Sequence, residues 1–198
     1  MKIGYYVQGA MDVGFVLGLA KRWCPEAELA EPVFRGSSEL SFRREIRKAM
    51  LDLRDAKACD VLVILTDSDV NSWRDVKQRE SAKVPAECRH LCVFGVTERN
   101  VECWLSIDRR QLAVELDCQA NDIPLDDPSG FVKRAFGIGQ RDEKRQAAME
   151  RVRDFVASVS LKPWIDGSDS FADFYDEARR LAALINCQIL NERGIVER

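Results

Sequence analysis

The stretch Val61-Leu-Val-Ile-Leu-Thr-Asp67-Ser-Asp69 decides the fold, because five aliphatic residues lead into two carboxylates one residue apart. An unbroken aliphatic run fits a strand buried on both faces, as in a parallel sheet covered by helices. Asp67 and Asp69 then lie at the carboxyl end of the strand, where open α/β sheets bind their ligands. Two ionised carboxylates this close repel each other, and a bridging cation relieves the repulsion. Hard oxygen ligands suit Mg²⁺ or Mn²⁺, so the sequence predicts a metal site here.

The composition is that of a folded, water-soluble protein. With 198 residues, 46% of them hydrophobic and 32% charged, the chain is long enough for one full core. The net charge of −3 gives no overall attraction to nucleic acid, so binding to phosphates needs a local basic patch. We find no signal peptide and no apolar run of membrane length, which predicts a cytoplasmic protein that does not enter a membrane.

The seven cysteines are scattered along the chain and form no CxxC pair. Scattered thiols fit a reduced cytosolic protein better than a secreted disulfide scaffold. Cys88 and Cys92 flank His90 and suggest zinc as an alternative, but no second ligand pair follows them.

Predicted strands and helices alternate through residues 1–117, which favours a mostly parallel sheet with helices on its faces. Pro32 within the second strand indicates an edge position, and Asp12 is a suitable N-cap for the first helix. The predicted strands are 2–7, 29–34, 60–66 and 91–96. The first predicted helix begins near residue 12, and the other three span 42–53, 71–83 and 98–107.

The pattern changes after residue 117. Residues 121–130 form a turn-rich connector, and helices are predicted over 129–136, 142–159 and 171–190. Ser170 and Asp173 have the spacing of a capping box at the start of the last helix. The sequence therefore predicts an α/β core over 1–117 and a helical extension over 118–198, which packs on the core or forms a partner surface. The apolar stripes of these helices are also compatible with a homo-oligomer.

The order of these motifs resembles the topoisomerase–primase (Toprim) domain. That family carries Glu-Gly after its first strand and Asp-x-Asp after a later one, which together hold a divalent cation. Here Gln8-Gly9 and Asp67-Ser68-Asp69 stand in those places. The resemblance covers residues 1–117 and implies a Toprim-like α/β fold.

A second resemblance covers nearly the whole chain. Glu102-Cys103-Trp104-Leu105 and Ser170-Phe171-Ala172-Asp173-Phe174 are similar to segments of small bacterial Toprim-like proteins of unknown function. These proteins are related to the overcoming-lysogenization-defect nucleases. The resemblance implies a nuclease of phage defence, with DNA or RNA as substrate and an ATPase as partner.

Gln8 departs from the Toprim pattern. A neutral amide can offer its carbonyl oxygen to a cation, but it lowers the negative charge of the site and cannot act as a base. Two interpretations follow from the resemblance: the chain is a degenerate family member, or a natural Glu at position 8 has been replaced by Gln. In a third interpretation, Gln8 has no role in the site and only caps the following helix.

The predicted catalytic residues are Gln8, Asp67, Asp69 and Glu102, and the predicted metal ligands are Asp67, Asp69, Glu98 and Glu102. Glu98 and Glu102 are expected one turn apart on the helix over 98–107, where they would supply a second carboxylate cluster for a two-metal site. The alternatives are structural, since Asp caps helices and forms Asx-turns after strands, and Glu98 suits the first turn of a helix.

Two groups of basic residues are candidates for binding a nucleic-acid backbone. The alternative for the first group is an ordinary solvated helix face, whereas the second group follows the Asp-x-Asp motif directly. The residues are Arg43, Arg44, Arg47 and Lys48 in the first group, and Arg74, Lys77 and Arg79 in the second. Lys133 and Arg134 are weaker candidates. Asp12 is close to Gln8-Gly9 in the sequence and is a candidate to face the metal site, with a helix cap as the simpler interpretation.

The sequence therefore favours a Mg²⁺-dependent Toprim-family nuclease or a nuclease-like subunit. A catalytically inactive module that binds nucleic acid or an ATPase is the alternative, because of Gln8. A haloacid-dehalogenase phosphatase also uses Asp-x-Asp, but that fold carries the motif on its first strand, and no convincing lysine motif follows it in this sequence.

Overall fold

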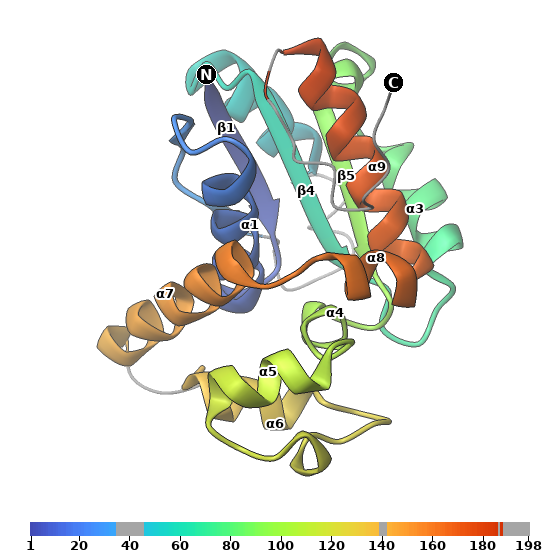
Figure 1. Cartoon of the computed structure of the whole chain (residues 1–198). Helices are drawn as coiled ribbons and strands as arrows, with labels where there is room; N and C mark the ends of the chain where they lie inside the picture. Colours follow the sequence, from blue (N-terminus) through green and yellow to red (C-terminus); the bar gives the residue numbers. More distant parts are fainter. Residues whose placement is uncertain (35–45, 139–141, 186, 188–198) are drawn as a thin grey trace, which may run out of the picture.

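Strand β4 (Val61–Asp67) lies inside a parallel sheet, as its aliphatic run predicts. The computed structural model describes residues 1–34, 46–138, 142–185 and 187. Within them five strands form one parallel sheet in the order β2-β1-β4-β5, and β3 also pairs with β1 (Figure 1). The other strands are β1 (Lys2–Val7), β2 (Glu28–Leu29), β3 (Val33–Phe34) and β5 (Cys92–Thr97). The predicted α/β class is confirmed.

Both faces of the sheet are buried, because alternate residues of β4 enter two different apolar clusters. Val61 and Leu65 join the cluster that contains the buried side chains of the first and last long helices. Leu62 and Ile64 join a second cluster, which contains Met50 and other apolar residues of 46–53. A strand with helices on both sides has no polar face, which explains the lack of alternation in its sequence.

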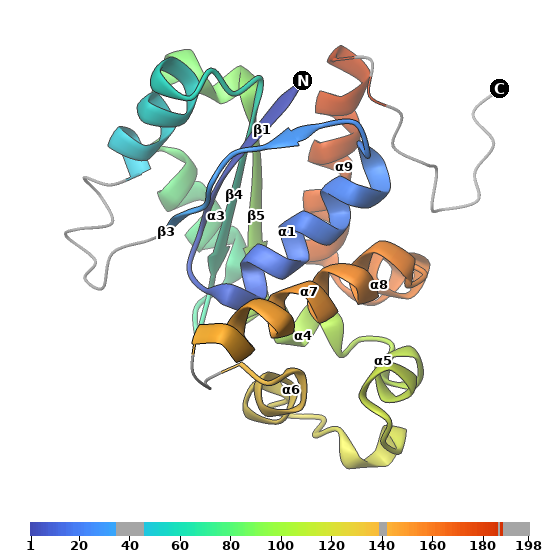
Figure 2. The same ribbon diagram turned by 90° about the vertical axis from the view of Figure 1, so that its left-hand side faces the viewer.

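Helices make up most of the rest of the described chain. The helical extension predicted after residue 117 is present, and its helices share one apolar cluster with the strands. Helix α7 packs against α1, and α9 packs against β5 (Figures 1 and 2). The helices are α1 (Ala10–Trp23), α3 (Trp73–Ser81), α4 (Val101–Leu105), α5 (Arg109–Leu116), α6 (Ser129–Phe136), α7 (Asp142–Ser158), α8 (Lys162–Gly167) and α9 (Asp169–Leu184), with a further helix over 46–51 that continues into a π-helix, Asp52–Ala56.

Helices α1 and α7 approach closely because α1 presents two glycines to its neighbour. A Cβ on Gly14 would lie 2.7 Å from the carbonyl oxygen of Met149, and one on Gly18 would lie 2.6 Å from that of Arg153. Only the absence of a side chain at both positions permits this approach.

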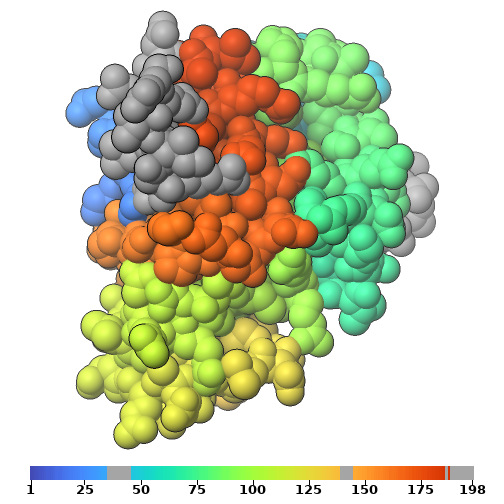
Figure 3. All heavy atoms as spheres, turned by 45° about the vertical axis from the view of Figure 1, so that its right-hand side comes forward, coloured from blue at the N-terminus to red at the C-terminus, as the bar shows by residue number. Residues whose placement is uncertain are grey.

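Helices α4, α5 and α6 lie beyond the carboxyl ends of the strands in both ribbon views (Figures 1 and 2). In the space-filling view the lime-to-yellow part of the chain, which contains them, forms a lobe below the orange and red C-terminal helices (Figure 3). This lobe therefore faces the end of the sheet at which the predicted site residues lie.

Two predictions about the ends of elements need correction. The predicted strand 29–34 is divided into β2 and β3 around Pro32, although its edge position is confirmed. The last helix begins at Asp169 and ends at Leu184, and its N-cap is Ser168, whose Oγ accepts a hydrogen bond from the N–H of Phe171 at 3.1 Å. Ser170 does not cap the helix, because its hydroxyl is buried and accepts the indole N–H of Trp104 at 2.8 Å.

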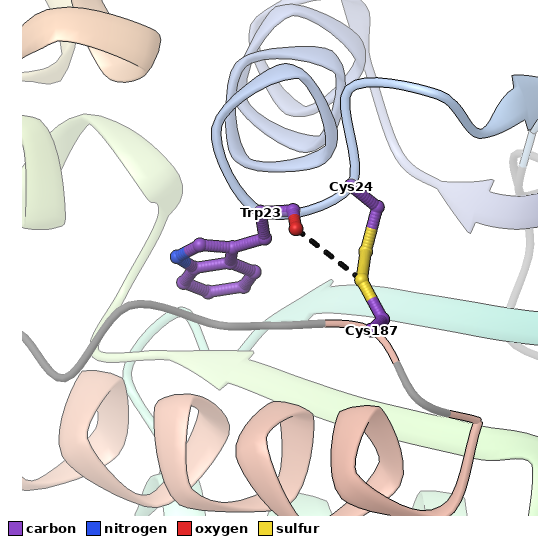
Figure 4. The surroundings of a disulfide bond; sticks show 3 residues. All are labelled: Trp23, Cys24 and Cys187. Atoms are coloured by element: carbon purple, nitrogen blue, oxygen red, sulfur yellow. Dashed lines mark hydrogen bonds between the residues drawn. A yellow bond between two sulfur atoms is a disulfide. The ribbon is translucent and has the colours of Figure 1, made fainter.

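The expectation of seven reduced thiols is wrong for one pair. Cys24, directly after α1, forms a disulfide with Cys187, and the Cys187 sulfur lies 3.2 Å from the carbonyl oxygen of Trp23 (Figure 4). The bond joins residues 163 positions apart, a pairing that no local spacing in the sequence indicates. No helix in the described part of the chain is long and apolar enough to cross a membrane.

Candidate metal centre

The carboxyl ends of three parallel strands meet at one edge of the sheet and bring the central candidates together. Gln8 follows β1, Asp67 is the last residue of β4, and Thr97, the last residue of β5, is in register with Asp67. The Thr97 hydroxyl donates a hydrogen bond to Asp67 Oδ1 at 3.1 Å. The side chain of Asp67 is thus held at the position where open α/β sheets bind ligands.

Asp12 lies beside this edge as a buried carboxylate. The N-cap of α1 is Gly9, so the prediction that Asp12 caps the helix is wrong by one turn. Its Oδ2 instead accepts the backbone N–H groups of Gln8 at 2.9 Å and Gly9 at 2.8 Å, which positions it at the end of β1. Burial and the charge of Asp67 raise the pKa of Asp12 to about 8, although these hydrogen bonds act in the opposite direction.

Asp67 shares this environment. Burial, together with the charges of Glu102 and Asp69, raises the pKa of Asp67 to about 7, while the hydrogen bond from Thr97 opposes the rise. Asp12 and Asp67 therefore act on each other, and both keep a proton at a pH at which an exposed carboxyl has lost it.

Glu102 completes a group of three carboxyl side chains. It lies in the first turn of α4, is 1% exposed, and its Oε1 is 3.3 Å from the ammonium of Lys133 on α6. Burial raises the pKa of Glu102, and Lys133 opposes that shift. The other oxygen, Oε2, is buried without a hydrogen-bond partner among the described residues. A buried carboxylate oxygen without a partner is costly and calls for a ligand.

Gln8 extends over the neighbouring strand. Its Nε2 donates a hydrogen bond to Oγ1 of the buried Thr66 at 2.8 Å. The amide of Gln8 therefore lies at the same edge of the sheet as Asp12 and Asp67. Toprim proteins carry a glutamate at the corresponding position.

Asp69 and Glu98 are arranged differently from Asp12, Asp67 and Glu102. Asp69 is exposed and has a left-handed backbone, with φ of +52°. The prediction that Glu98 shares a helix face with Glu102 is wrong, because Arg99 has φ of +73° and α4 begins only at Val101, after its N-cap Asn100. Asp69 and Glu98 instead line a hollow of about 400 Å³, together with Ser68, the residue after Asp67.

The basic candidates lie in several places. Arg74 is 2.8 Å from the carboxylate of Asp169, and Lys77 forms ion pairs with Asp173 and Glu177, so both contact α9. Their binding to phosphate stays a prediction. Among the other basic candidates, Arg47 and Lys48 are exposed, Arg79 pairs with Glu80, and Arg43 and Arg44 lie outside the described residues.

Sequence reasoning gave little weight to Asp12 and Lys133, and it missed Thr66 and Thr97. A signal for the two threonines was present, since each is a polar residue at the end of an aliphatic strand. The position of Lys133 had no such signal, because its contact with Glu102 depends on how α6 folds back over the sheet.

The donor set suits a hard divalent cation. Carboxylate oxygens are the preferred ligands of Mg²⁺ and Mn²⁺, and a cation would satisfy Glu102 Oε2 and favour the ionised forms of Asp12 and Asp67. Across the described residues, however, no group of three or more His, Cys, Asp or Glu side chains is already arranged to hold a metal ion. Binding therefore requires these carboxylates to move closer together.

An apolar cavity of about 60 Å³ lies at the opposite end of the sheet, between α1, α9 and the beginnings of the strands. Its walls include Ile3, Val61, Val93 and Phe174. Walls of this kind suit an apolar group and not a cation or a phosphate.

Comparison with known proteins leaves this site as the main guide to function, since the chain matches no family model, no curated protein and no solved structure.

Proposed function

We propose that this protein is a Mg²⁺- or Mn²⁺-dependent nuclease of the Toprim type, or a nuclease-like subunit, that acts on the phosphodiesters of DNA or RNA. The observation that carries the proposal is the gathering of the buried Asp12 and Glu102 and the half-buried Asp67 at the carboxyl ends of parallel strands, with one oxygen of Glu102 unpaired. Three acidic groups that destabilise one another are a costly arrangement for a fold, and a cation offsets that cost.

Asp67 and Glu102 are the proposed principal ligands, with Asp12 and the carbonyl oxygen of Gln8 as further donors. When bound, the cation would stabilise the developing negative charge on the phosphate and lower the pKa of an attacking water. The hydrogen bond from Thr97 orients the carboxylate of Asp67, and the two backbone N–H groups orient that of Asp12, so both side chains face the site from which a cation would draw them closer together.

Lys133 provides the positive charge of the site. Its side chain is 46% exposed and lies between Glu102 and solvent, where an incoming phosphate would approach. Once Glu102 is committed to a cation, the ammonium of Lys133 is available to a phosphate oxygen. The helical lobe thus contributes a residue that binds substrate.

The wider biological role rests on the resemblance to Toprim proteins. It includes phage defence and an ATPase partner. A cytoplasmic location is proposed from the sequence alone, and the Cys24–Cys187 disulfide departs from the reduced thiols expected there. The strand order and the positions of Gln8 and Asp67 support the Toprim assignment, since Gln8 directly follows β1 and Asp67 ends the adjacent parallel strand β4.

A second candidate function is a catalytically inactive module that binds nucleic acid or an ATPase. The observation in its favour is Gln8, whose amide is neutral and donates to Thr66 instead of supplying a carboxylate. Such a module would bind its partner without cutting it.

The test is a nuclease assay of this chain beside Gln8→Glu, with Mn²⁺, Mg²⁺ or EDTA, on plasmid DNA and on RNA. We expect metal-dependent cleavage by Gln8→Glu, and its loss when Asp67→Asn is added. The exposed Gln78→Glu is the matched control and leaves activity unchanged. If neither the parent nor Gln8→Glu cuts either substrate, the inactive module is the better account.

A further inference from the structure

The hollow of about 400 Å³ beside Asp69 is formed by the loops that follow β4 and β5. Its lining combines apolar and hydrogen-bonding groups: Val70 and Trp73 on one side, and Asn71, Ser72, Glu98 and Arg99 around them. Ser68 and Asp69 also line it, and Ser68 directly follows Asp67 in the chain. The hollow is therefore adjacent to the proposed metal centre.

Trp73 is the unusual feature of this hollow. The other three tryptophans, Trp23, Trp104 and Trp164, are at most 7% exposed, whereas Trp73 is only half-buried. The guanidinium of Arg74 lies 4.4 Å from the centroid of the Trp73 ring, which places a cation over the indole. Part of the Trp73 side chain packs against the apolar cluster that contains Met50, and the part that lines the hollow is the surface left for a planar ligand.

Val70 extends the apolar surface. Its side chain is 91% exposed, although it lies only one residue beyond Asp69. A single exposed apolar residue is ordinary, and Val70 matters only because it lines the same hollow as Trp73. Val70 and Trp73 together give the hollow an apolar part.

The frame of the hollow is held by hydrogen bonds between the two loops. The backbone N–H of Asp69 donates to the carbonyl oxygen of Arg99 at 3.1 Å, and the N–H of Arg99 donates to the Ser68 hydroxyl at 2.9 Å. Arg99 is exposed at this edge and adds a positive charge. The carboxylates of Asp69 and Glu98 also line the hollow, so a fitting ligand has a flat aromatic part with N–H donors for them and an anionic group placed at Arg99.

We propose that the hollow binds an unpaired nucleobase of a single-stranded nucleic acid, stacked on Trp73, next to the metal centre that holds the phosphate. This inference rests on the proposed function and adds a substrate class to it. Stacking on an aromatic ring tolerates every base, because each base has a π-face. A base inside a duplex is already stacked on both faces, so the geometry favours single strands over double strands.

The experiment follows tryptophan fluorescence while a short oligo-dT is added, with Ca²⁺ in place of Mg²⁺ to prevent cutting. Trp73 reports on the hollow, because the other three tryptophans are buried. We expect saturable quenching that Trp73→Phe abolishes while binding, measured by anisotropy of a labelled oligonucleotide, persists. Trp73→Leu keeps an apolar side chain, and we expect it to weaken binding by roughly tenfold.

Two results would overturn the inference. One is binding by anisotropy without quenching, with equal affinity for the parent and Trp73→Leu. The other is equal quenching by a duplex of the same length, or by an aromatic peptide without phosphates, which would indicate a protein partner. Neither result affects the proposed nuclease, which is decided by metal-dependent cleavage of plasmid DNA and of RNA. The thermal midpoint of each variant checks that it is folded.

Discussion

The backbone N–H of Asp69 donates a hydrogen bond to the carbonyl oxygen of Arg99 at 3.1 Å, and both residues have a left-handed backbone, with φ of +52° and +73°. This pair joins the loop after β4 to the loop after β5. Non-glycine residues adopt such angles at a cost, and they persist where the surroundings fix them, often at functional sites. The pair fixes the loops on either side of the Asp67 carboxylate.

The left-handed backbone at Arg99 predicts opposite effects for two substitutions. Arg99→Gly relieves the backbone strain, and we expect its free energy of unfolding to stay within about 1 kcal/mol of the parent. Arg99→Val places a β-branched residue at the same angles and should destabilise the fold by more than about 1 kcal/mol. Urea unfolding of both variants measures the difference. Equal stability of the two would contradict the strained geometry.

The raised pKa values of Asp12 and Asp67 predict a pH dependence of stability in EDTA. From the ordinary carboxyl range up to about 7 for Asp67 and about 8 for Asp12, the folded state holds more protons than the unfolded state. The free energy of unfolding therefore falls as pH rises through this window, on the order of 1 kcal/mol per pH unit.

Urea titrations between pH 5.5 and 8.5 measure this slope. Asp67→Asn removes one of the two groups and should flatten it, whereas Asp166→Asn, an exposed residue on α8, should not. A free energy of unfolding that rises with pH over the same range would contradict the raised pKa values of Asp12 and Asp67.

The close approach of α1 and α7 predicts that Gly18→Ala destabilises the protein, although alanine favours helices. The added Cβ would lie 2.6 Å from the carbonyl oxygen of Arg153 and 2.6 Å from Cβ of Val156. We expect a loss of about 1–3 kcal/mol, as for other overpacked cores. Gly9→Ala is the control, since nothing lies within 4 Å of its added Cβ. A higher thermal midpoint for Gly18→Ala than for the parent would refute this packing.

The disulfide predicts five titratable thiols in the unfolded, non-reduced protein and seven after reduction. Cys187→Ser should lower the free energy of unfolding by about 2–4 kcal/mol, because a cross-link restricts the unfolded chain. Cys118→Ser, which removes a free thiol, serves as the control. Thiol counts with a coloured reagent and thermal melts test both statements, and seven thiols before reduction would exclude the bond.

The parts of the fold that follow from local chemistry could be predicted from the sequence. The aliphatic run before Asp67 predicts β4 and its burial on both faces, and β1 and α6 occur with the predicted bounds. The helix boundary after Glu98 could not be predicted, because nothing in the local sequence marks the left-handed turn at Arg99.

The site itself depends on contacts between distant residues. Lys133 meets Glu102 only because α6 folds over the end of the sheet, and Cys24 meets Cys187 across almost the whole chain. Periodicity and motif spacing carry no information about such pairs. Asp12 was visible as a polar residue at a helix start, but its burial beside Asp67 is a property of the fold.

Binding of a divalent cation by Asp12, Asp67 and Glu102 is the central claim, and Mn²⁺ binding followed by electron paramagnetic resonance at pH 8 tests it most directly. We expect saturable binding by the parent chain, weakened at least about tenfold in Asp67→Asn and in Glu102→Gln, and unchanged in Asp166→Asn. Equal Mn²⁺ affinity in the parent and in Asp67→Asn, or no binding by any of them, would contradict the claim.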